Sequence, residues 1–154
     1  MKTEEKGDLA RVIAIKSRKT GIRYEVNEEN TEMSIMFGLD EVVLEIPAGK
    51  LDSKQEDHEE AARRELKEET GYTAKELIPL GKFYPACAYS DETIWMYLAK
   101  GLELGERNPD EDEFLDVELI PLKDLVTEVL AGRIPDAKTQ IAILKAAAYE
   151  GILK

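Results

Sequence analysis

The sequence lacks several features that define common classes of protein. It contains one cysteine, Cys87, so an intrachain disulfide is excluded. A single thiol fits a reducing cytoplasm, and we expect Cys87 to be a small buried or half-buried side chain. No apolar run approaches the roughly 20 residues that span a bilayer, and no apolar segment typical of a signal peptide follows the charged N-terminus. We therefore expect a cytoplasmic protein without a membrane segment.

Basic residues are also scarce. The chain has 21 Lys and Arg residues against 33 Asp and Glu residues, which gives a formal net charge of -12. Nucleic-acid backbones are bound by clustered Lys and Arg, so this balance argues against a nucleic-acid partner. A small anionic substrate remains compatible with it, because a bound metal ion inverts the local field.

The length and the hydrophobic pattern predict one α/β domain. The chain has 154 residues, of which 43% are hydrophobic, enough to bury a core. Strands are predicted over residues 9–16, 22–26, 33–37, 42–46, 76–84, 93–100 and 114–120. Helices are predicted over residues 57–70, from 121–124 to near 132, and over 137–150, where Ile141, Leu144 and Ala148 share a face. We expect helices packed over a mixed sheet in a single domain of residues 1–154, with 1–8 flexible.

The helix over residues 57–70 carries a group of carboxylates suited to a metal ion. Glu65, Glu68 and Glu69 stand at i, i+3 and i+4, which puts them on one helical face. Such carboxylates repel one another unless a hard cation such as Mg²⁺ or Mn²⁺ bridges them. Arg64 points about 100° away around the helix and can orient a neighbouring ligand. Glu56 can supply an oxygen to a second ion. The alternative is a charge-rich helix that is simply solvated.

A longer pattern around this helix resembles a known motif. Residues 49–72 resemble the box of the Nudix hydrolases, because Glu56 is followed by seven residues and then by Arg64-Glu65-Leu66-Lys67-Glu68-Glu69-Thr70-Gly71-Tyr72. The resemblance implies the Nudix-type α/β/α sandwich, with its loop and helix carrying the metal. One departure is visible. Six residues, where the motif has five, separate Gly49 from Glu56, so the loop is one residue longer.

The flanking segments resemble the ADP-ribose pyrophosphatase branch of that superfamily. These are the lead-in Leu44-Glu45-Ile46-Pro47-Ala48-Gly49-Lys50-Leu51, the loop from Phe83-Tyr84-Pro85 to Asp91-Glu92, and Asp136-Ala137-Lys138-Thr139. The resemblance implies substrate contacts at Glu45, Tyr84 and Glu92. Cys87-Ala88 replaces the Pro-Gly pair expected in the loop. The strands over residues 9–41 are divergent, with Arg23 the one residue similar to the branch's arginine strand.

The resemblance also implies a reaction. It is the metal-dependent hydrolysis of a nucleoside diphosphate linked to another group, with ADP-ribose giving AMP and ribose 5-phosphate. The implied metal ligands are Ala48 through its carbonyl, Glu65, Glu68, Glu69 and Glu56, with Mg²⁺ or Mn²⁺ as the cofactor. Glu113, and after it Glu111, is implied as the base that takes the proton from water, with Glu68 and Arg64 assisting. We interpret His58 as a surface residue of the helix.

Two other functions stay open. The enzyme could act on another nucleotide sugar, a dinucleoside polyphosphate or an oxidised nucleotide, as the altered Cys87-Ala88 loop suggests. The longer loop before Glu56 leaves room for a nucleotide-binding module without catalysis. The branch also implies a homodimer, in which the apolar 9–15 strand or the last helix would form the interface.

Overall fold

The computed structural model describes residues 11–19, 22–26, 33–37, 41–106 and 116–153, and side chains within 43–106 and 117–153. The strands are β1 (Arg11–Lys19), β2 (Ile22–Val26), β3 (Met33–Phe37), β4 (Glu41–Glu45), β5 (Tyr72–Phe83), β6 (Ile94–Leu104) and β7 (Asp116–Pro121). The helices are α1 (His58–Thr70), α2 (Leu122–Leu130) and α3 (Ala137–Tyr149). No helix within the described ranges is long and apolar enough to cross a membrane. The prediction for residues 1–8 lies outside the described residues.

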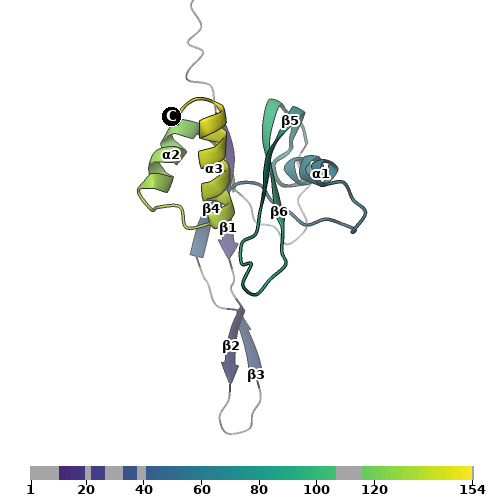
Figure 1. Cartoon of the computed structure of the whole chain (residues 1–154), viewed down its shortest axis with the longest axis vertical. Helices are drawn as coiled ribbons and strands as arrows, with labels where there is room; N and C mark the ends of the chain where they lie inside the picture. The colour runs from purple at the N-terminus through teal and green to yellow at the C-terminus, as the bar shows by residue number, and fades with distance from the viewer. Residues whose placement is uncertain (1–10, 20–21, 27–32, 38–40, 107–115, 154) are drawn as a thin grey trace, which may run out of the picture.

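The strands form three sheets (Figure 1). β1 lies in the middle of a three-stranded sheet between β4 and β7, while β2 pairs with β3 and β5 pairs with β6. The α/β class is therefore as predicted. Every strand pair in the described part of the chain is antiparallel, however, whereas the sequence predicted a mixed sheet. The consecutive pairs β2–β3 and β5–β6 are joined as hairpins, a connection that antiparallel pairing permits.

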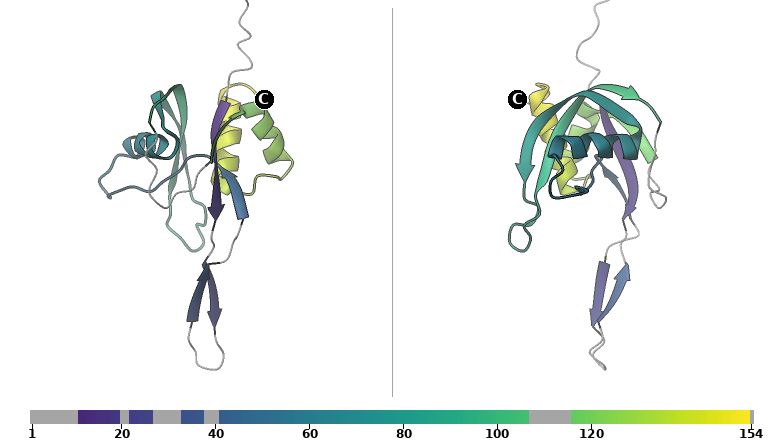
Figure 2. Two further views of the ribbon diagram at one scale, coloured as in Figure 1. Left: turned by 180° about the vertical axis from the view of Figure 1, so that it is seen from behind. Right: turned by 90° about the vertical axis from the view of Figure 1, so that its right-hand side faces the viewer.

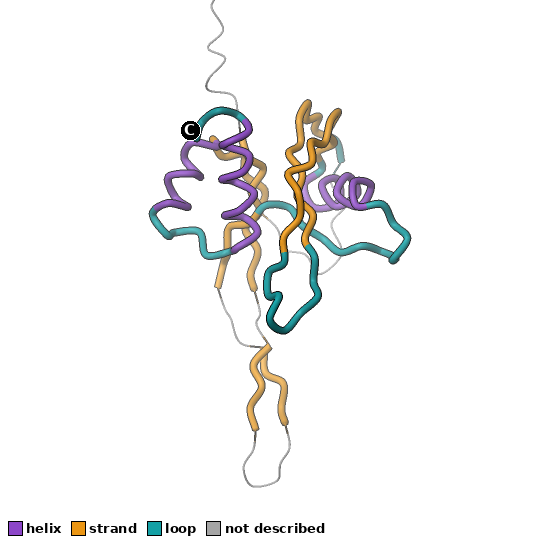
Figure 3. Tube along the Cα trace, viewed as in Figure 1, coloured by secondary structure: helices purple, strands orange, loops and turns teal. Residues whose placement is uncertain are grey.

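The helices lie on opposite sides of the molecule. α2 and α3 lie beside the sheet of β4, β1 and β7, whereas α1 lies against the β5–β6 hairpin (Figures 1 and 2). The β2–β3 hairpin projects away from both groups (Figure 3). The segment between β4 and α1 crosses from one group to the other. It contains the Pro47-Ala48-Gly49 sequence, so the predicted metal loop lies at the junction.

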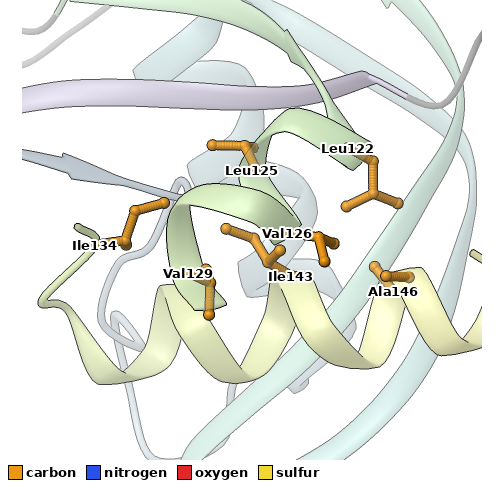
Figure 4. Packing of buried hydrophobic residues seen from close by; sticks show 8 residues of the cluster. Leu122, Leu125, Val126, Val129, Ile134, Ile143 and Ala146 are labelled. Atoms are coloured by element: carbon orange, nitrogen blue, oxygen red, sulfur yellow. The ribbon is translucent and has the colours of Figure 1, made fainter. Parts of the chain in front are cut away.

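The main hydrophobic core lies between α2 and α3. Its buried members come from both helices and the turn between them: Leu122, Leu125, Val126, Val129, Ile134, Ile143, Ala146 and Ala147 (Figure 4). On α3 the buried positions are 139, 142, 143, 146 and 147. The sequence placed Ala148 on the apolar face, which is wrong, because Ala148 is exposed. Ala146 and Ala147 on α3 are 6% and 0% exposed within this cluster.

The loop after β5 differs from expectation at its cysteine. Cys87 was expected to be buried or half-buried, and it is exposed. It lies in a turn in which the amides of Tyr89 and Ser90 both donate to the Ala86 carbonyl. A tight surface turn leaves its central side chains outside the core, which explains the difference.

The contribution of the core can be tested on α2. Leu125 is 2% exposed and packs in the cluster, whereas Leu130 on the same helix is 71% exposed. We expect Leu125→Ala to lower the free energy of unfolding by about 2–5 kcal/mol, because it removes buried methyl groups and leaves a cavity. Urea denaturation measures the loss. Leu130→Ala is the matched control and should change the value by less than about 0.5 kcal/mol; equal losses in both variants would contradict the packing.

Candidate metal and substrate site

The ends of α1 are set by two capping residues, Asp57 and Gly71. Asp57 is the N-cap, and its carboxylate accepts from the amides of Glu59 at 2.9 Å and Glu60 at 3.2 Å. Gly71 ends the helix at φ 77°, a left-handed conformation that glycine adopts without strain. Its amide donates to the Lys67 carbonyl at 2.9 Å. These caps fix where the helix that carries the glutamates begins and ends.

Arg64 is the centre of the carboxylate cluster. Its guanidinium donates to Glu65 Oε1 at 2.8 Å, Glu68 Oε2 at 3.0 Å and Glu56 Oε1 at 3.1 Å. A further N–H donates to the Lys50 carbonyl at 2.9 Å. The hydrogen bond from Arg64 is the main reason that the pKa of Glu56 lies below its usual value, and the same contacts raise the pKa of Arg64. Arg64 thus gathers carboxylates that would otherwise repel.

The extra residue before Glu56 is accommodated inside a local turn. The Glu56 amide donates to the Ser53 carbonyl at 3.2 Å, and Glu56 Oε2 accepts from the Asp52 amide at 2.6 Å. The loop folds back on itself, so its additional length does not move Glu56 away from Arg64. Short surface loops absorb an added residue at small entropic cost.

The Ala48–Gly49 backbone packs directly against two of the glutamates. The Ala48 amide donates to Glu69 Oε2 at 3.0 Å, and Glu69 is only 6% exposed. A Cβ placed on Gly49 would lie 1.8 Å from Glu65 Cδ. Only glycine leaves room for the Glu65 carboxylate at this position. The structure therefore brings Ala48, Glu65 and Glu69 together, as the sequence predicted for three of the metal ligands.

The donor set suits a hard divalent cation. It consists of carboxylates on one helical face beside the backbone of a glycine-containing loop, which is the oxygen chemistry that Mg²⁺ and Mn²⁺ prefer. Within residues 43–106 and 117–153, no three acidic, His or Cys side chains converge as a formed cation site. The reason is visible in the contacts, since Glu56, Glu65 and Glu68 turn toward Arg64 and Glu69 turns toward the Ala48 amide.

A cavity of about 710 Å³ opens beside these residues. Ala48, Gly49 and Glu65 line it on one side, and Glu92 and Trp95 belong to its wall as well. Of the predicted substrate contacts, Glu92 lines the cavity. Glu45 does not, because it is 4% exposed and bonded to Lys138, and Tyr84 is an exposed residue outside the lining. The candidate bases Glu111 and Glu113 lie outside the described residues.

Two residues that line the cavity, His58 and Trp95, were not predicted from the sequence as site residues. The rings of His58 and Trp95 stack with centroids 4.3 Å apart and planes at 27°, and both line the cavity. Lys82 Nζ lies 5.4 Å from the Trp95 ring and 5.4 Å from the Tyr84 ring. His58 was interpreted as a residue of the helix surface, and this stack shows that it also contacts β6. Trp95 could have been found from its position, because it follows the predicted substrate loop by three residues.

The role of Arg64 can be tested by acid titration of Glu56. A carboxylate whose pKa is lowered in the folded state adds stability that is present above its ordinary pKa and is lost as the pH falls through the folded value. We expect Glu56 to titrate below 4.5 in the native chain and to shift upward in Arg64→Met, because the principal donor is gone. NMR of the carboxyl carbon measures both. Arg63→Met is the control, since Arg63 bonds Glu59 and the Ala74 carbonyl; a shift of Glu56 in that variant would contradict the assignment.

Comparison with known proteins agrees with this geometry. The chain is 45% identical over 107 residues to an ADP-ribose pyrophosphatase of Bacillus subtilis (strain 168), a match that covers 68% of this chain and 57% of that protein. It is 30% identical over 145 residues to a GDP-mannose pyrophosphatase of Yersinia enterocolitica, covering 92% of this chain and 74% of the relative. The chain thus spans little more than half the length of the B. subtilis relative.

A solved structure shares the fold. It is titled as an ADP compounds hydrolase and superposes with a TM-score of 0.68 at 26% identity, over 90% of this chain and 65% of that one. The family model described as the NUDIX domain matches residues 34–141, which include most of β3, all of β4, the glutamate helix α1 and the start of α3. The matched region carries the Arg64 cluster and the Gly49 loop. This chain belongs to the Nudix family.

Proposed function

We propose that the chain hydrolyses the pyrophosphate bond of a nucleoside diphosphate linked to a second group, with ADP-ribose as the preferred substrate. The observation that supports this most is the approach of the Ala48–Gly49 backbone to the Glu65 and Glu69 carboxylates at the edge of the cavity. The similarity to an ADP-ribose pyrophosphatase points to the same substrate class. A diphosphate needs its charge neutralised before water can attack, and a metal held by carboxylates serves that purpose.

The metal in this proposal is Mg²⁺, with Mn²⁺ as an alternative. Glu65, Glu68 and Glu69 would hold it together with the Ala48 carbonyl, and Glu56 would hold a second ion. The bound ion supplies charge neutralisation of the diphosphate and a more acidic water. All of these donors are oxygens, and an ion there would take over the compensation of negative charge that Arg64 provides. Arg64 would then hold Glu56 and the ligand rotamers in place.

The reaction transfers one phosphoryl group to water. The water oxygen forms a bond to one phosphorus atom, the bridging P–O bond breaks, and the bridging oxygen leaves with the other phosphate. For ADP-ribose the products are AMP and ribose 5-phosphate. Glu113 accepts the proton from the attacking water, and Glu111 is the second candidate for this role. Both residues precede β7 in the chain, and the acidic sequence around them supplies carboxylates for proton transfer.

One observation favours a second candidate substrate. The relative from Y. enterocolitica that the chain resembles over most of its length is named for GDP-mannose. The loop that the ADP-ribose branch closes with Pro-Gly carries an exposed Cys87 and Ala88 in this chain. The same loop reaches the cavity at Asp91 and Glu92, so a change within it can alter which base or sugar fits. A nucleotide-binding module without catalysis is the third candidate, which the intact glutamate set disfavours.

We also propose a homodimer, as the resemblance implies. The two interfaces considered from the sequence are largely used within the chain. β1 is paired on both edges, with β4 and β7, and α3 contributes its apolar face to the core with α2. Among the described elements, the projecting β2–β3 hairpin lies apart from both groups and could contact a second copy (Figure 2).

The proposed reaction is tested by product release with a metal-ligand variant. With ADP-ribose and Mg²⁺ we expect AMP and ribose 5-phosphate in equal amounts. Glu69→Gln should lower kcat/KM by at least ~100-fold, because loss of a metal ligand removes several kcal/mol of charge stabilisation. Chromatography of the nucleotide product measures the rate. Glu76→Gln, an exposed glutamate on β5, is the matched control and should leave the rate unchanged.

Three outcomes separate the candidates. A higher kcat/KM with GDP-mannose than with ADP-ribose would make GDP-mannose the proposed substrate and leave the proposed reaction class unchanged. Nucleotide binding by calorimetry without turnover in Mg²⁺ or Mn²⁺ would favour the binding module. Equal rates for the native chain and Glu69→Gln would refute the metal assignment.

The general base is tested by two neighbouring substitutions. Glu113→Gln should lower kcat by about 10²–10⁴-fold, the usual contribution of a positioned base, with little change in Mn²⁺ affinity. Glu111→Gln should have a smaller effect on kcat. A larger loss in Glu111→Gln would reverse the assignment, and equal small losses would remove both residues from catalysis.

A further inference from the structure

We propose that Glu45, Asp136, Lys138 and Thr139 form a clamp that positions the Ile46–Gly49 loop against the glutamate helix. The clamp couples the start of α3 to the loop that carries the Ala48 carbonyl and the Gly49 backbone. It rests on the proposed function, since its purpose is to hold that loop at the metal. These residues act through the loop, so they are positioning residues and not catalytic ones.

The clamp is a continuous chain of hydrogen bonds. Lys138 Nζ donates to Glu45 Oε1 at 2.5 Å and to Asp136 Oδ2 at 2.9 Å. The same Asp136 oxygen accepts from the Thr139 hydroxyl at 2.6 Å and from the Thr139 amide at 3.0 Å. The Thr139 hydroxyl in turn accepts from the Ile46 amide at 3.1 Å. Residues 93 positions apart in the sequence are thereby joined twice, through a side-chain pair and through the loop backbone.

The clamp is attached to the N-terminus of α3, whose apolar face is buried in the core with α2. Asp136 is the N-cap of α3, so the residue that accepts from Thr139 also begins the helix. Four residues after Thr139, Ile143 is 1% exposed in the core with α2. Thr139 and Glu45 are 2% and 4% exposed. Burial alone would raise the pKa of Asp136, but the bonds from Thr139 and Lys138 outweigh burial and hold the pKa below its usual value.

The loop is held from both sides. The Ile46 amide donates to Thr139 on α3, and the Ala48 amide donates to Glu69 on α1. Glu69 is a proposed metal ligand, so its bond to the Ala48 amide competes with the ion. The hydrogen bond from the Ile46 amide to Thr139 involves no proposed metal ligand, so it can persist whether or not the ion is bound. Because Gly49 leaves no room for even a methyl group beside Glu65, a small shift of the loop would disturb the carboxylate.

This assignment changes the role of one residue. The family resemblance implied Glu45 as a substrate contact, but its side chain is buried and bonded to Lys138, and it does not line the cavity. A buried carboxylate without its cation would be strongly destabilising, which explains why Lys138 lies beside it. Glu45 therefore anchors the strand end from which the loop departs.

The hydroxyl of Thr139 offers the sharpest test. Thr139→Val keeps the shape of the side chain and removes the acceptor for the Ile46 amide, whereas Thr139→Ser keeps the hydroxyl. We expect Thr139→Val to speed hydrogen exchange at the Ile46 amide at least ~10-fold and to weaken Mn²⁺ binding by about 10–100-fold, as for other groups that orient metal ligands. Thr139→Ser should restore both values. NMR exchange and calorimetric titration with Mn²⁺ alone, without nucleotide, give the two measurements.

Thr127→Val serves as the control for this test, and specific results would overturn the clamp. Thr127→Val removes an exposed hydroxyl on α2 that donates to the Lys123 carbonyl at 3.1 Å, and it should change neither measurement. Unchanged Ile46 exchange in Thr139→Val, or equal defects in the Val and Ser variants, would overturn the clamp. A native chain that binds no Mn²⁺ would contradict the proposed function instead, and the exchange of Ile46 with its rescue by serine would still decide the clamp.

Discussion

The glutamate helix depends on the balance between one guanidinium and the carboxylates around it. Glu65 and Glu68 lie on the same helix as Arg64, and Glu56 approaches from the loop before it. In a chain of net charge -12, such a group is stable only if a positive charge lies within it. Arg64 provides one charge for four carboxylates, because Asp52 Oδ2 also lies 3.1 Å from its Nε. The remaining negative charge is an excess that a divalent cation would neutralise, so the same contacts that order the helix leave it suited to a metal.

The geometry of the loop follows from this arrangement. The Gly49 backbone approaches Glu65 so closely that a Cβ on Gly49 would lie 1.8 Å from Glu65 Cδ. Glu69 accepts from the adjacent Ala48 amide, so both carboxylates of this helical face contact the same loop. Glu65 also accepts from Arg64 and therefore lies between the arginine and the loop.

Local sequence signals predicted the elements that local interactions determine. The helix predicted over residues 57–70 agrees with α1, because its ends are set by caps at Asp57 and Gly71 that involve residues within one turn. The bond between Lys138 and Glu45 joins distant segments, and no periodicity in either segment indicates it. The exposure of Cys87 and the buried face of α3 were also mispredicted, because both depend on which element packs opposite. Antiparallel pairing throughout the described strands is a property of the whole fold, which strand patterns alone do not specify.

The turn between Asp52 and Glu56 accommodates an additional residue without changing the geometry of the site. Gly49 is fixed on one side by Glu65, and Glu56 is fixed on the other by Arg64, yet the turn contains one residue more than the motif requires. Ser53, Lys54 and Gln55 are exposed and closed by their own hydrogen bond. This stretch can therefore differ in length or composition without displacing Gly49 or Glu56.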